Sequence, residues 1–414
     1  MKALVLCGGI PQIALIEELK SRGIITVLAD KNERVEGRKY ADIFYPVSTL
    51  DIERIKNVAI QEQVDFIITV CADQVLQVVA EVSEMLGLPC YIDYKTARNV
   101  SQKSYMKKIF EKNGIPTSKY SVMKNFDETM VKDISFPMIV KPVDSYSSRG
   151  VKKVYNIEEL KNAFWKATEI SRTDTAIIEE YVEGRELTVD VYVEGGEAKL
   201  LCISELDKIS SVDRFVIYRT KYPADISDKI LKLVEITAQK IADAFKLKNT
   251  PMLIQLLTNG EKISVVEFCA RTGGGDKFRL IKKVSGFDVI KAAVDLELGK
   301  KPHAQKIFFE QKYIVNEFLY CKPGKFDHLE GFEELVQEGI ITEYFQLKPS
   351  GAEFTSILSS GDRVAYFTIE DSDVRRLKER HKNANCRIKA VNVDGKDMLR
   401  HDLIDDYGNE RGGT

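Results

Sequence analysis

The first 95 residues alternate short apolar runs with amphipathic stretches, and this alternation restricts the possible folds more than any other feature. Apolar runs at residues 2–6, 24–29 and 66–70 are typical of strands. Between them, apolar side chains recur at helical spacing, as Ile13 and Ile16 do. Strands that alternate with helices predict a parallel, doubly wound sheet.

The carboxyl ends of parallel strands are where such sheets bind ligands. Gly8, Asp30 and Asp73 stand at these ends. A dinucleotide site is one interpretation of the first turn. However, the sequence Gly8-Gly9-Ile10-Pro11 lacks the G-x-G-x-x-G spacing that this mechanism requires, so we do not expect NAD or FAD to bind here.

The remainder of the chain has a different pattern. Short runs rich in Val, Ile and Tyr with glycine turns favour an antiparallel sheet. The expected elements are, in order, a polar helical region at 96–122, antiparallel strands within 137–205, an amphipathic helix at 226–246, strands at 252–257 and 263–268 around the turn 258–261, and a mixed part at 300–414.

Composition excludes several classes of protein. Hydrophobic residues make up 44% of the 414 residues and charged residues 30%, so we expect a packed core. The net charge of −2 argues against nucleic acid as the main partner. No apolar run approaches the roughly 20 residues of a membrane span, and the apolar N-terminal run is too short for a secretory signal. A cytoplasmic protein is the simplest expectation.

Cysteine and histidine do not form metal-binding or disulfide patterns. The seven cysteines are scattered singly, without a CxxC pair, so neither a disulfide framework nor a structural zinc site is expected. The four histidines lack an HExxH spacing, and surface or capping roles are expected for them.

Five local features follow one another in the chain. The first is Lys141, which ends a buried strand before Pro142 and is either a solvated lysine or a cation directed at phosphates. The second is the small-residue loop 144–151, whose backbone amides could wrap phosphate oxygens or form a hairpin turn. The third is the strand 176–180, which leads through acids to Gly184 and Glu186. It is either an edge strand with solvated glutamates or a hinge facing an adenine and its ribose.

The last two features lie in a predicted hairpin. Strand pairing can bring Gln255 and Glu267 to one face, where hard oxygen ligands suit Mg²⁺ bound to phosphates. Arg271 follows, where it can neutralise a transferring phosphoryl group, and three glycines, Gly273 to Gly275, let a substrate approach the backbone.

In this order and spacing, the set resembles the ATP-grasp superfamily, over essentially the whole chain. It is most similar to the stand-alone carboxylate–amine and amino-acid ligases and to the halves of the carbamoyl-phosphate synthase large subunit. The resemblance implies a mixed α/β and α+β chain: a doubly wound domain at 1–98, an ATP-grasp domain at 99–300 with its lid at about 120–185, and a small mixed domain at 301–414.

The resemblance also implies the roles of individual residues. ATP and Mg²⁺ (or Mn²⁺) are the expected cofactors, and Arg271 and Lys141 the catalytic residues. The implied nucleotide contacts are Lys103, Lys141, Ser145, Ser147, Ser148, Gly150, Glu179, Glu180, Tyr181, Val182 and Glu186, and the implied metal ligands are Gln255 and Glu267.

Two positions depart from the family's pattern. Cys269 stands where the family usually has asparagine or another oxygen donor, and a thiol is a poor Mg²⁺ ligand. The second metal would then depend on Glu267 and phosphate oxygens. Tyr146 stands where the family tends to have a small residue.

The implied reaction activates a carboxylate as an acyl phosphate and joins it to an amine, with release of ADP and phosphate. A carboxylase or carbamoyl-type reaction is one alternative, and a non-catalytic nucleotide-binding protein is another. Cys269 as a nucleophile lacks a paired base in the sequence. A homodimer is left open.

The partners expected are a small carboxylate and an amine, whose identities the sequence does not specify. Cations outside the five features are the candidates for holding the carboxylate, although the basic segment 208–221 could equally be an exposed loop. The candidate substrate residues are Arg214, Arg219, Gly273, Gly274 and Arg279.

Overall fold

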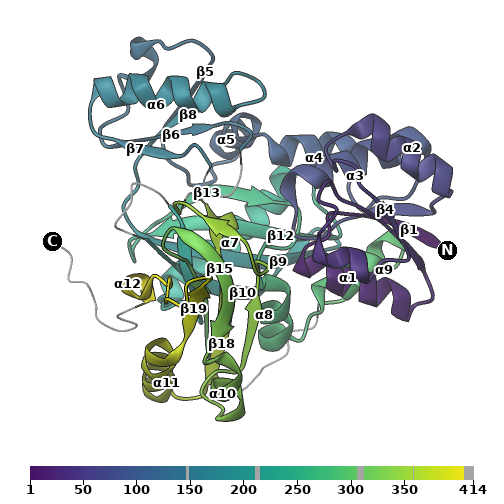
Figure 1. Cartoon of the computed structure of the whole chain (residues 1–414). Coiled ribbons are helices and arrows are strands. Elements are labelled where there is room, and N and C mark those ends of the chain that lie inside the picture. Colours follow the sequence, from purple (N-terminus) through teal and green to yellow (C-terminus); the bar gives the residue numbers. More distant parts are fainter. Residues whose placement is uncertain (146–148, 210–214, 305–311, 358, 405–414) are drawn as a thin grey trace. The chain divides into compact units, whose positions relative to one another are not determined.

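The computed structural model describes residues 1–145, 149–209, 215–304, 312–357 and 359–404. The chain divides into two compact units (Figure 1). The first unit comprises Met1–Ser118, Thr188–Cys202 and Ile226–Phe308, and the second comprises Lys119–Leu187, Ile203–Asp225 and Phe309–Thr414. The division into domains at 1–98, 99–300 and 301–414 stays a prediction.

The first unit begins with a four-stranded parallel sheet in the order β3-β2-β1-β4. Residues Ala3 to Leu6 of β1 are fully buried, as a central strand covered on both faces requires. The predicted parallel sheet is confirmed. Its elements are β1 (Lys2–Leu6), α1 (Ile10–Ser21), β2 (Ile25–Ala29), β3 (Ile43–Tyr45), α2 (Ile52–Glu62), β4 (Phe66–Ile68) and α3 (Asp73–Leu86).

Local signals explain where these helices begin and end. The Asp51 carboxylate accepts a hydrogen bond from the Arg54 amide and caps α2. Helix α3 ends at Gly87, whose φ of +67° lies in the left-handed region that glycine adopts without strain.

The same unit contains a second group of elements. They are α4 (Tyr94–Ser101), α5 (Lys103–Lys112), α7 (Asp228–Ala244), β12 (Thr250–Thr258), β13 (Ile263–Cys269), α8 (Lys277–Ser285) and α9 (Val289–Glu297). Strands β9 (Arg185–Glu194) and β10 (Glu197–Lys208) contribute residues to both units. Helix α1 packs against α9 (Figure 1). The Arg22 guanidinium donates to Asp295 at 2.6 Å beside this contact.

The second unit contains a four-stranded antiparallel sheet in the order β5-β8-β6-β7. Its strands are β5 (Tyr120–Met123), β6 (Met138–Pro142), β7 (Lys152–Val154) and β8 (Ala176–Glu180). This confirms the predicted antiparallel pairing in the first part of 137–205.

Helix α6 (Ile157–Ile170), which the sequence analysis did not predict, interrupts that region and packs against the sheet (Figure 1). Its buried residues include Leu160, Phe164 and Ala167, and their spacing is that of one helix face. The Asn156 side chain accepts from the Glu159 amide and starts the helix. The prediction of strands alone was wrong here because this helical period was not recognised.

The rest of the second unit is a mixed part built on antiparallel strands in the order β11-β14-β18-β16, with a separate sheet β17-β15-β19. Its core includes Phe326, Phe367 and Leu377, all fully buried. The elements are β11 (Ile217–Tyr222), β14 (Tyr313–Leu319), β15 (Gly324–Glu330), α10 (Phe332–Gln337), β16 (Glu343–Gln346), β17 (Glu353–Phe354), β18 (Ala365–Asp371), α11 (Val374–Arg387), β19 (Lys389–Asn392) and α12 (His401–Ile404), with short 3₁₀ turns at Glu36–Lys39, Glu128–Val131 and Ser360–Asp362.

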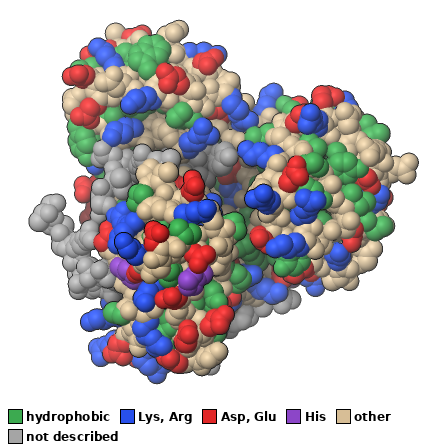
Figure 2. Space-filling view, in the orientation of Figure 1, with side chains coloured by type: hydrophobic (Ala, Val, Ile, Leu, Met, Phe, Trp, Pro, Cys, Tyr) green, Lys and Arg blue, Asp and Glu red, His purple; other side chains and the backbone are tan. Residues whose placement is uncertain are grey.

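Two surface properties bear on function. Figure 2 shows Lys and Arg side chains interspersed with Asp and Glu over the visible face of the molecule. Among the residues that the structure describes, no helix is long and apolar enough to cross a membrane.

Candidate functional site

The hairpin of β12 and β13 brings together the two predicted metal ligands. Gln255 and Glu267 are direct partners across the hairpin, and the register shifts just after Gln255. Opposite residues of an antiparallel pair project from the same face. The predicted pairing of Gln255 with Glu267 is therefore confirmed, and their role as metal ligands stays a prediction.

Lys103 extends from the first residue of α5 to this hairpin. Its ammonium lies 3.1 Å from Glu267 Oε2, with 14% of the Lys103 side chain exposed. Burial lowers the pKa of Lys103, but the Glu267 carboxylate raises it by more, so the group stays charged. A predicted phosphate contact and a predicted metal ligand thus lie side by side.

Arg271 follows the end of β13, and Asp73 holds its guanidinium in a bidentate ion pair. Nε donates to Asp73 Oδ1 at 2.6 Å, and Nη2 donates to Oδ2. Nη1 donates to the Thr272 carbonyl at 2.5 Å. Burial raises the pKa of Asp73, but the Arg271 guanidinium and other nearby groups lower it by more, so the pKa lies below its usual value. The fork is oriented by these bonds and keeps N–H groups for another anion.

Asp73 is a site residue that the sequence analysis did not include among its candidates. It begins α3 directly after strand β4. Its place at the carboxyl end of a strand was recognised, but its partner lies 198 residues away in the sequence. No local spacing connects the two residues.

Cys269 is the last residue of β13, between Glu267 and Arg271. Burial is the largest cause that raises the pKa of its thiol well above the usual value, and the Asp73 and Glu267 carboxylates add to this effect. Since the thiolate is the form that attacks or binds metal, Cys269 is a poor nucleophile and a poor metal ligand at neutral pH.

The glycine loop after Arg271 covers a buried ion pair. Lys277 Nζ donates to Thr188 Oγ1 at 2.6 Å and lies 3.5 Å from Asp190 Oδ2. A Cβ atom at Gly273 would lie 3.0 Å from Lys277 Cγ and 3.3 Å from Asp190 Oδ1. Any larger residue would crowd this pair, which explains glycine at this position. Gly274 is more open, with its nearest neighbour, the Cys71 carbonyl oxygen, 3.9 Å from such an atom.

Asp190 and Lys277 were also missing from the sequence candidates. Burial raises the pKa of Asp190, while Lys277 partly offsets the rise. Asp190 lies inside a strand with no distinguishing local pattern. Arg279, a predicted substrate residue, lies with Nε 3.5 Å from Asp276 Oδ1 and is partly exposed.

In the second unit, Lys141 and Glu179 form a buried ion pair. The Nζ and Oε2 atoms are 2.6 Å apart, and each side chain is 6% exposed. The register pairs Lys141 with Ile177 and Ile139 with Glu179, so the two charged residues are diagonal neighbours on one face. Lys141 is therefore not a solvated lysine at a strand end.

The segment that follows Glu179 contains the other predicted nucleotide contacts. The amides of Glu180 and Tyr181 donate to the carbonyls of Lys119 and Pro137. Val182 follows directly. Glu186 forms an ion pair with Lys208.

The predicted phosphate loop is described only in part. Ser145 Oγ donates to the Arg149 carbonyl at 2.8 Å. Gly150 has a φ of +76°, and a Cβ atom there would lie 2.9 Å from Ile170 Cδ1, so glycine is required. Ser147 and Ser148, with Tyr146, lie outside the described residues.

Arg219 is only 2% exposed. Its Nε donates to Glu317 Oε2 at 2.5 Å, and Nη2 donates to the Ile404 carbonyl at 3.1 Å. These bonds stabilise the packing of β11 on β14. A role of Arg219 in substrate binding stays a prediction. Arg214 lies outside the described residues.

Comparison with known protein families identifies one domain. Residues 134–278 match the model of the ATP-grasp domain. This range contains Lys141, Glu179, Gln255, Glu267 and Arg271.

Three curated relatives are similar to parts of the chain. A formate-dependent phosphoribosylglycinamide formyltransferase of Sulfurisphaera tokodaii is 32% identical over 46% of this chain and 49% of that protein. A D-alanine–D-alanine ligase of Bacillus velezensis is 30% identical over 49% and 62%. The mitochondrial carbamoyl-phosphate synthase (ammonia) of Aquarana catesbeiana is 24% identical over 70% and 20%. Each match spans less than two thirds of the relative's own length.

A solved structure extends the likeness in fold. The crystal structure of an L-amino acid ligase from Bacillus licheniformis superposes with a TM-score of 0.80, at 16% identity, over 94% of this chain and 98% of that one. The predicted fold class and the predicted relationship are both confirmed. The chain is an ATP-grasp domain protein, related to the carbamoyl-phosphate synthase large chains, the formate-dependent formyltransferases and the D-alanine–D-alanine ligases.

Proposed function

We propose that this protein is an ATP-dependent ligase that activates a carboxylate as an acyl phosphate and joins it to an amine, with release of ADP and phosphate. The observation that carries the proposal is the group at the end of the β12–β13 hairpin. There Glu267, Lys103 and the Asp73-bound Arg271 combine a carboxylate with two cations. Such a group suits a metal-bound polyphosphate.

The residues of the hairpin fit a magnesium ion. Glu267 supplies a carboxylate and Gln255 an amide oxygen across the strand pair, and hard oxygen ligands are those that Mg²⁺ prefers. In the described ranges, no group of three or more His, Cys, Asp or Glu side chains could hold a metal ion. This agrees with Mg²⁺ carried in by ATP, which keeps phosphate and water ligands. When bound, the ion neutralises charge on the phosphoryl oxygens.

We assign the remaining contacts residue by residue. Lys141 and Lys103 contact phosphates, and Ser145 and Gly150, with Ser147 and Ser148, belong to the covering loop. Glu179 orients Lys141, because its carboxylate is already bound to that ammonium. The segment Glu180–Val182 faces the adenine, and Glu186 binds the ribose.

Catalysis in this proposal consists of positioning and charge neutralisation. The carboxylate attacks the γ-phosphorus of ATP, and the bond to the bridging oxygen of ADP breaks. The amine then attacks the acyl carbon, loses a proton, and displaces phosphate. Arg271, oriented by Asp73, stabilises the charge on the acyl phosphate. Gly273 and Gly274 offer backbone amides to the carboxylate, and Arg279, which follows them at the start of α8, is the candidate cation.

A second candidate is activation of a one-carbon acid. The 32% identical relative is a formate-dependent formyltransferase, and another relative is a carbamoyl-phosphate synthase. The first name specifies formate, and the second specifies carbamoyl phosphate, a one-carbon acyl phosphate. The same residues would serve, since the phosphoryl transfer is common to both candidates.

The test is release of ADP with panels of carboxylates and amines. A ligase requires two organic co-substrates, whereas the second candidate responds to formate or bicarbonate. A protein that only binds nucleotide releases none with any combination. Lys141→Ala should abolish turnover and weaken ATP binding by about 1.5–3 kcal/mol, the contribution of a hydrogen bond to a charged group. Normal ATP affinity and turnover in this variant would refute the assignment.

A further inference from the structure

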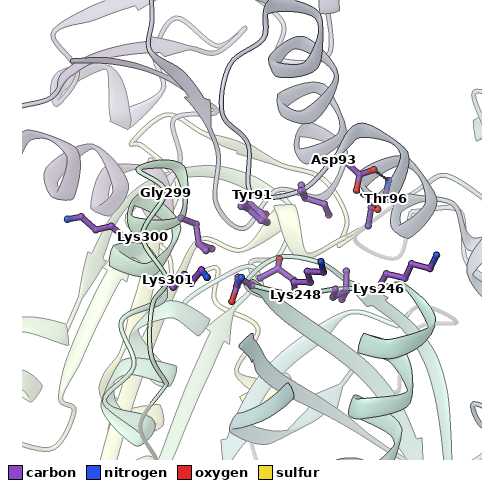
Figure 3. Close-up of a pocket in the computed structure, with 13 residues that line it drawn as sticks. Tyr91, Asp93, Thr96, Lys246, Lys248, Gly299, Lys300 and Lys301 are labelled. Atoms are coloured by element: carbon purple, nitrogen blue, oxygen red, sulfur yellow. Dashed lines mark hydrogen bonds between the residues drawn. The ribbon is translucent and has the colours of Figure 1, made fainter. Parts of the chain in front are cut away.

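A cavity of about 470 Å³ opens within the first unit, lined by the start of α4, the segment between α7 and β12, and the end of α9 (Figure 3). Cavities of this size hold small molecules. Its lining includes four lysines, Lys246, Lys248, Lys300 and Lys301. In Figure 3, Lys246 and Lys300 extend toward opposite sides of the view, and Lys248 and Lys301 lie between them.

The lining is rich in hydrogen-bond donors. Within the part of the chain that the structure describes, the ammonium groups of Lys246, Lys248 and Lys301 form no ion pair, and Lys300 lies 3.7 Å from Asp295. The Asn249 side-chain carbonyl accepts from the Gly195 amide at 3.0 Å. Its NH₂ group is therefore the part of the side chain left to donate to a ligand.

Asp93 is the one acidic residue of the described lining, and its charge is already engaged. Its carboxylate accepts from the amide and the hydroxyl of Thr96 at the start of α4, at 2.8 and 2.7 Å. An acid that caps a helix is stabilised by the helix N-terminus. The cavity as a whole therefore carries a positive charge that an anion would neutralise.

We propose that this cavity binds a small phosphorylated metabolite, with Lys248, Lys301 and the Asn249 amide as its contacts. The excess of cations supports phosphate rather than carboxylate. The described lining includes four lysines and one acid, and a phosphate group carries more negative charge and more acceptor oxygens than a carboxylate. The volume exceeds that of a phosphate group alone, so an organic portion of the ligand also fits.

Two lining residues connect this cavity to Arg271. Tyr91 Oη donates to the Ala270 carbonyl at 3.2 Å, and Thr250 Oγ1 lies 3.4 Å from the same oxygen. Ala270 directly precedes Arg271 in the chain. A ligand that shifts Tyr91 or Thr250 would therefore alter the position of Arg271. This regulatory consequence rests on the proposed function, whereas binding to the cavity does not.

The binding test uses isothermal titration of the full chain with inorganic pyrophosphate at constant ionic strength. Lys248→Glu/Lys301→Glu should bind about tenfold more weakly than the wild type, or worse, because two charged contacts are lost. Lys108→Glu/Lys112→Glu, on the exposed face of α5, makes the same change in net charge and should bind almost normally. Lys141→Ala should keep this binding site, since it alters only the candidate nucleotide site.

Three results would overturn the proposal: no binding by the wild type, equal weakening in both double variants, or loss of the site in Lys141→Ala. If the charge-reversed variant does not fold, Lys248→Gln/Lys301→Gln removes the two positive charges without reversing them and must show the weakening. Coupling is tested separately by ADP release. At saturating Mg·ATP, which displaces pyrophosphate from the nucleotide site, pyrophosphate should change the rate in the wild type and not in Lys248→Gln/Lys301→Gln. If no turnover is found at all, the titration still decides whether the cavity binds phosphates.

Discussion

At the scale of single residues, buried charge determines how this site can act. Arg271 is held by Asp73, Lys103 by Glu267 and Lys141 by Glu179, and the side chains of the three cations are 10%, 14% and 6% exposed. Paired charges tolerate burial, whereas burial and the neighbouring Asp73 and Glu267 carboxylates keep the Cys269 thiol protonated. Cys269 is also one of the two positions at which the sequence departs from the pattern of the family that it resembles.

Cys269→Asn separates two roles of this position. An asparagine oxygen would add a hard ligand next to Glu267, so activity should be kept or raised and should need less Mg²⁺. If Cys269 were a nucleophile, the same change would reduce turnover by several orders of magnitude. Turnover is measured against Mg²⁺ concentration, with Cys269→Ser as the matched control. A collapse of activity in both variants would contradict our assignment.

Glu297, in α9, predicts a pH dependence of stability. Burial raises the pKa of this carboxyl to about 8, although the Tyr91 amide lowers it somewhat. The folded state keeps this proton up to about pH 8, while the unfolded state releases it near pH 4.5. The free energy of unfolding should therefore fall as pH rises from 4.5 through 8, by on the order of a few kcal/mol.

Glu297→Gln should remove this loss, because an amide does not titrate. The difference in melting temperature between Glu297→Gln and the wild type should grow from pH 5 to pH 9. Glu84→Gln, on the exposed side of α3, is the control and should follow the wild type. A constant difference across this pH range would show that Glu297 does not stay protonated in the folded protein.

At the scale of elements, the β12–β13 hairpin and the β11–β14 pair use strand register for different purposes. The hairpin turn places Gln255 opposite Glu267 at a partly exposed position. In the other pair, Arg219 lies opposite Glu317, and the His381 ring lies 2.9 Å from the same carboxylate. Both Arg219 and Glu317 are nearly inaccessible. The buried Arg219–Glu317 pair is therefore expected to stabilise the fold.

Glu317→Leu tests this structural role. Removing one partner of a buried ion pair leaves a buried charge and should destabilise the protein by about 3–5 kcal/mol. The double variant Arg219→Met/Glu317→Leu should recover most of this loss. Urea unfolding measures both, with Glu338→Leu at the exposed Arg387–Glu338 pair as a control that should change little. An unstable double variant would mean that Arg219 has further partners of importance, such as the Ile404 carbonyl.

At the scale of the whole molecule, positive and negative side chains are mixed on the face that Figure 2 shows rather than gathered by sign. A net charge of −2 gives no long-range attraction for polyanions, so binding of ATP must come from local groups. The candidates are the ion pairs described above. A nucleotide that binds the folded chain and not the unfolded chain should stabilise the folded state.

Mg·ATP should raise the melting temperature. At a concentration 100 times the Kd, the stabilisation is about 2.7 kcal/mol. Glu267→Gln should fold normally, because the side chains have the same shape, but should lose the additional stabilisation that Mg²⁺ brings. Thermal unfolding with ATP alone, with Mg²⁺ alone and with both separates the stabilisation by ATP from the additional stabilisation by Mg²⁺. If Glu267→Gln gained as much from Mg·ATP as the wild type, this carboxylate would not be a metal ligand.

Local features of the sequence were enough to predict much of this protein. The alternation in the first 95 residues indicated the parallel sheet, and the Asn259-Gly260 turn indicated the hairpin that pairs Gln255 with Glu267. Both depend on interactions between near neighbours, which periodicity and turn residues report directly. Helix α6 had the same kind of local signal and was missed.

Only the tertiary structure decided which charged groups meet. Asp73 binds Arg271 across 198 positions, and Arg219 is buried against Glu317 across 98. Lys277 of α8 likewise pairs with Asp190 of the distant strand β9. Arg279, which is partly exposed, and Arg219, which is buried, are the same type of residue, and both were predicted to contact the substrate. Their exposure differs because distant segments of the chain pack over one of them and not over the other. A buried charge needs an oppositely charged partner, and the spacing of residues in the sequence does not show which distant segment provides it.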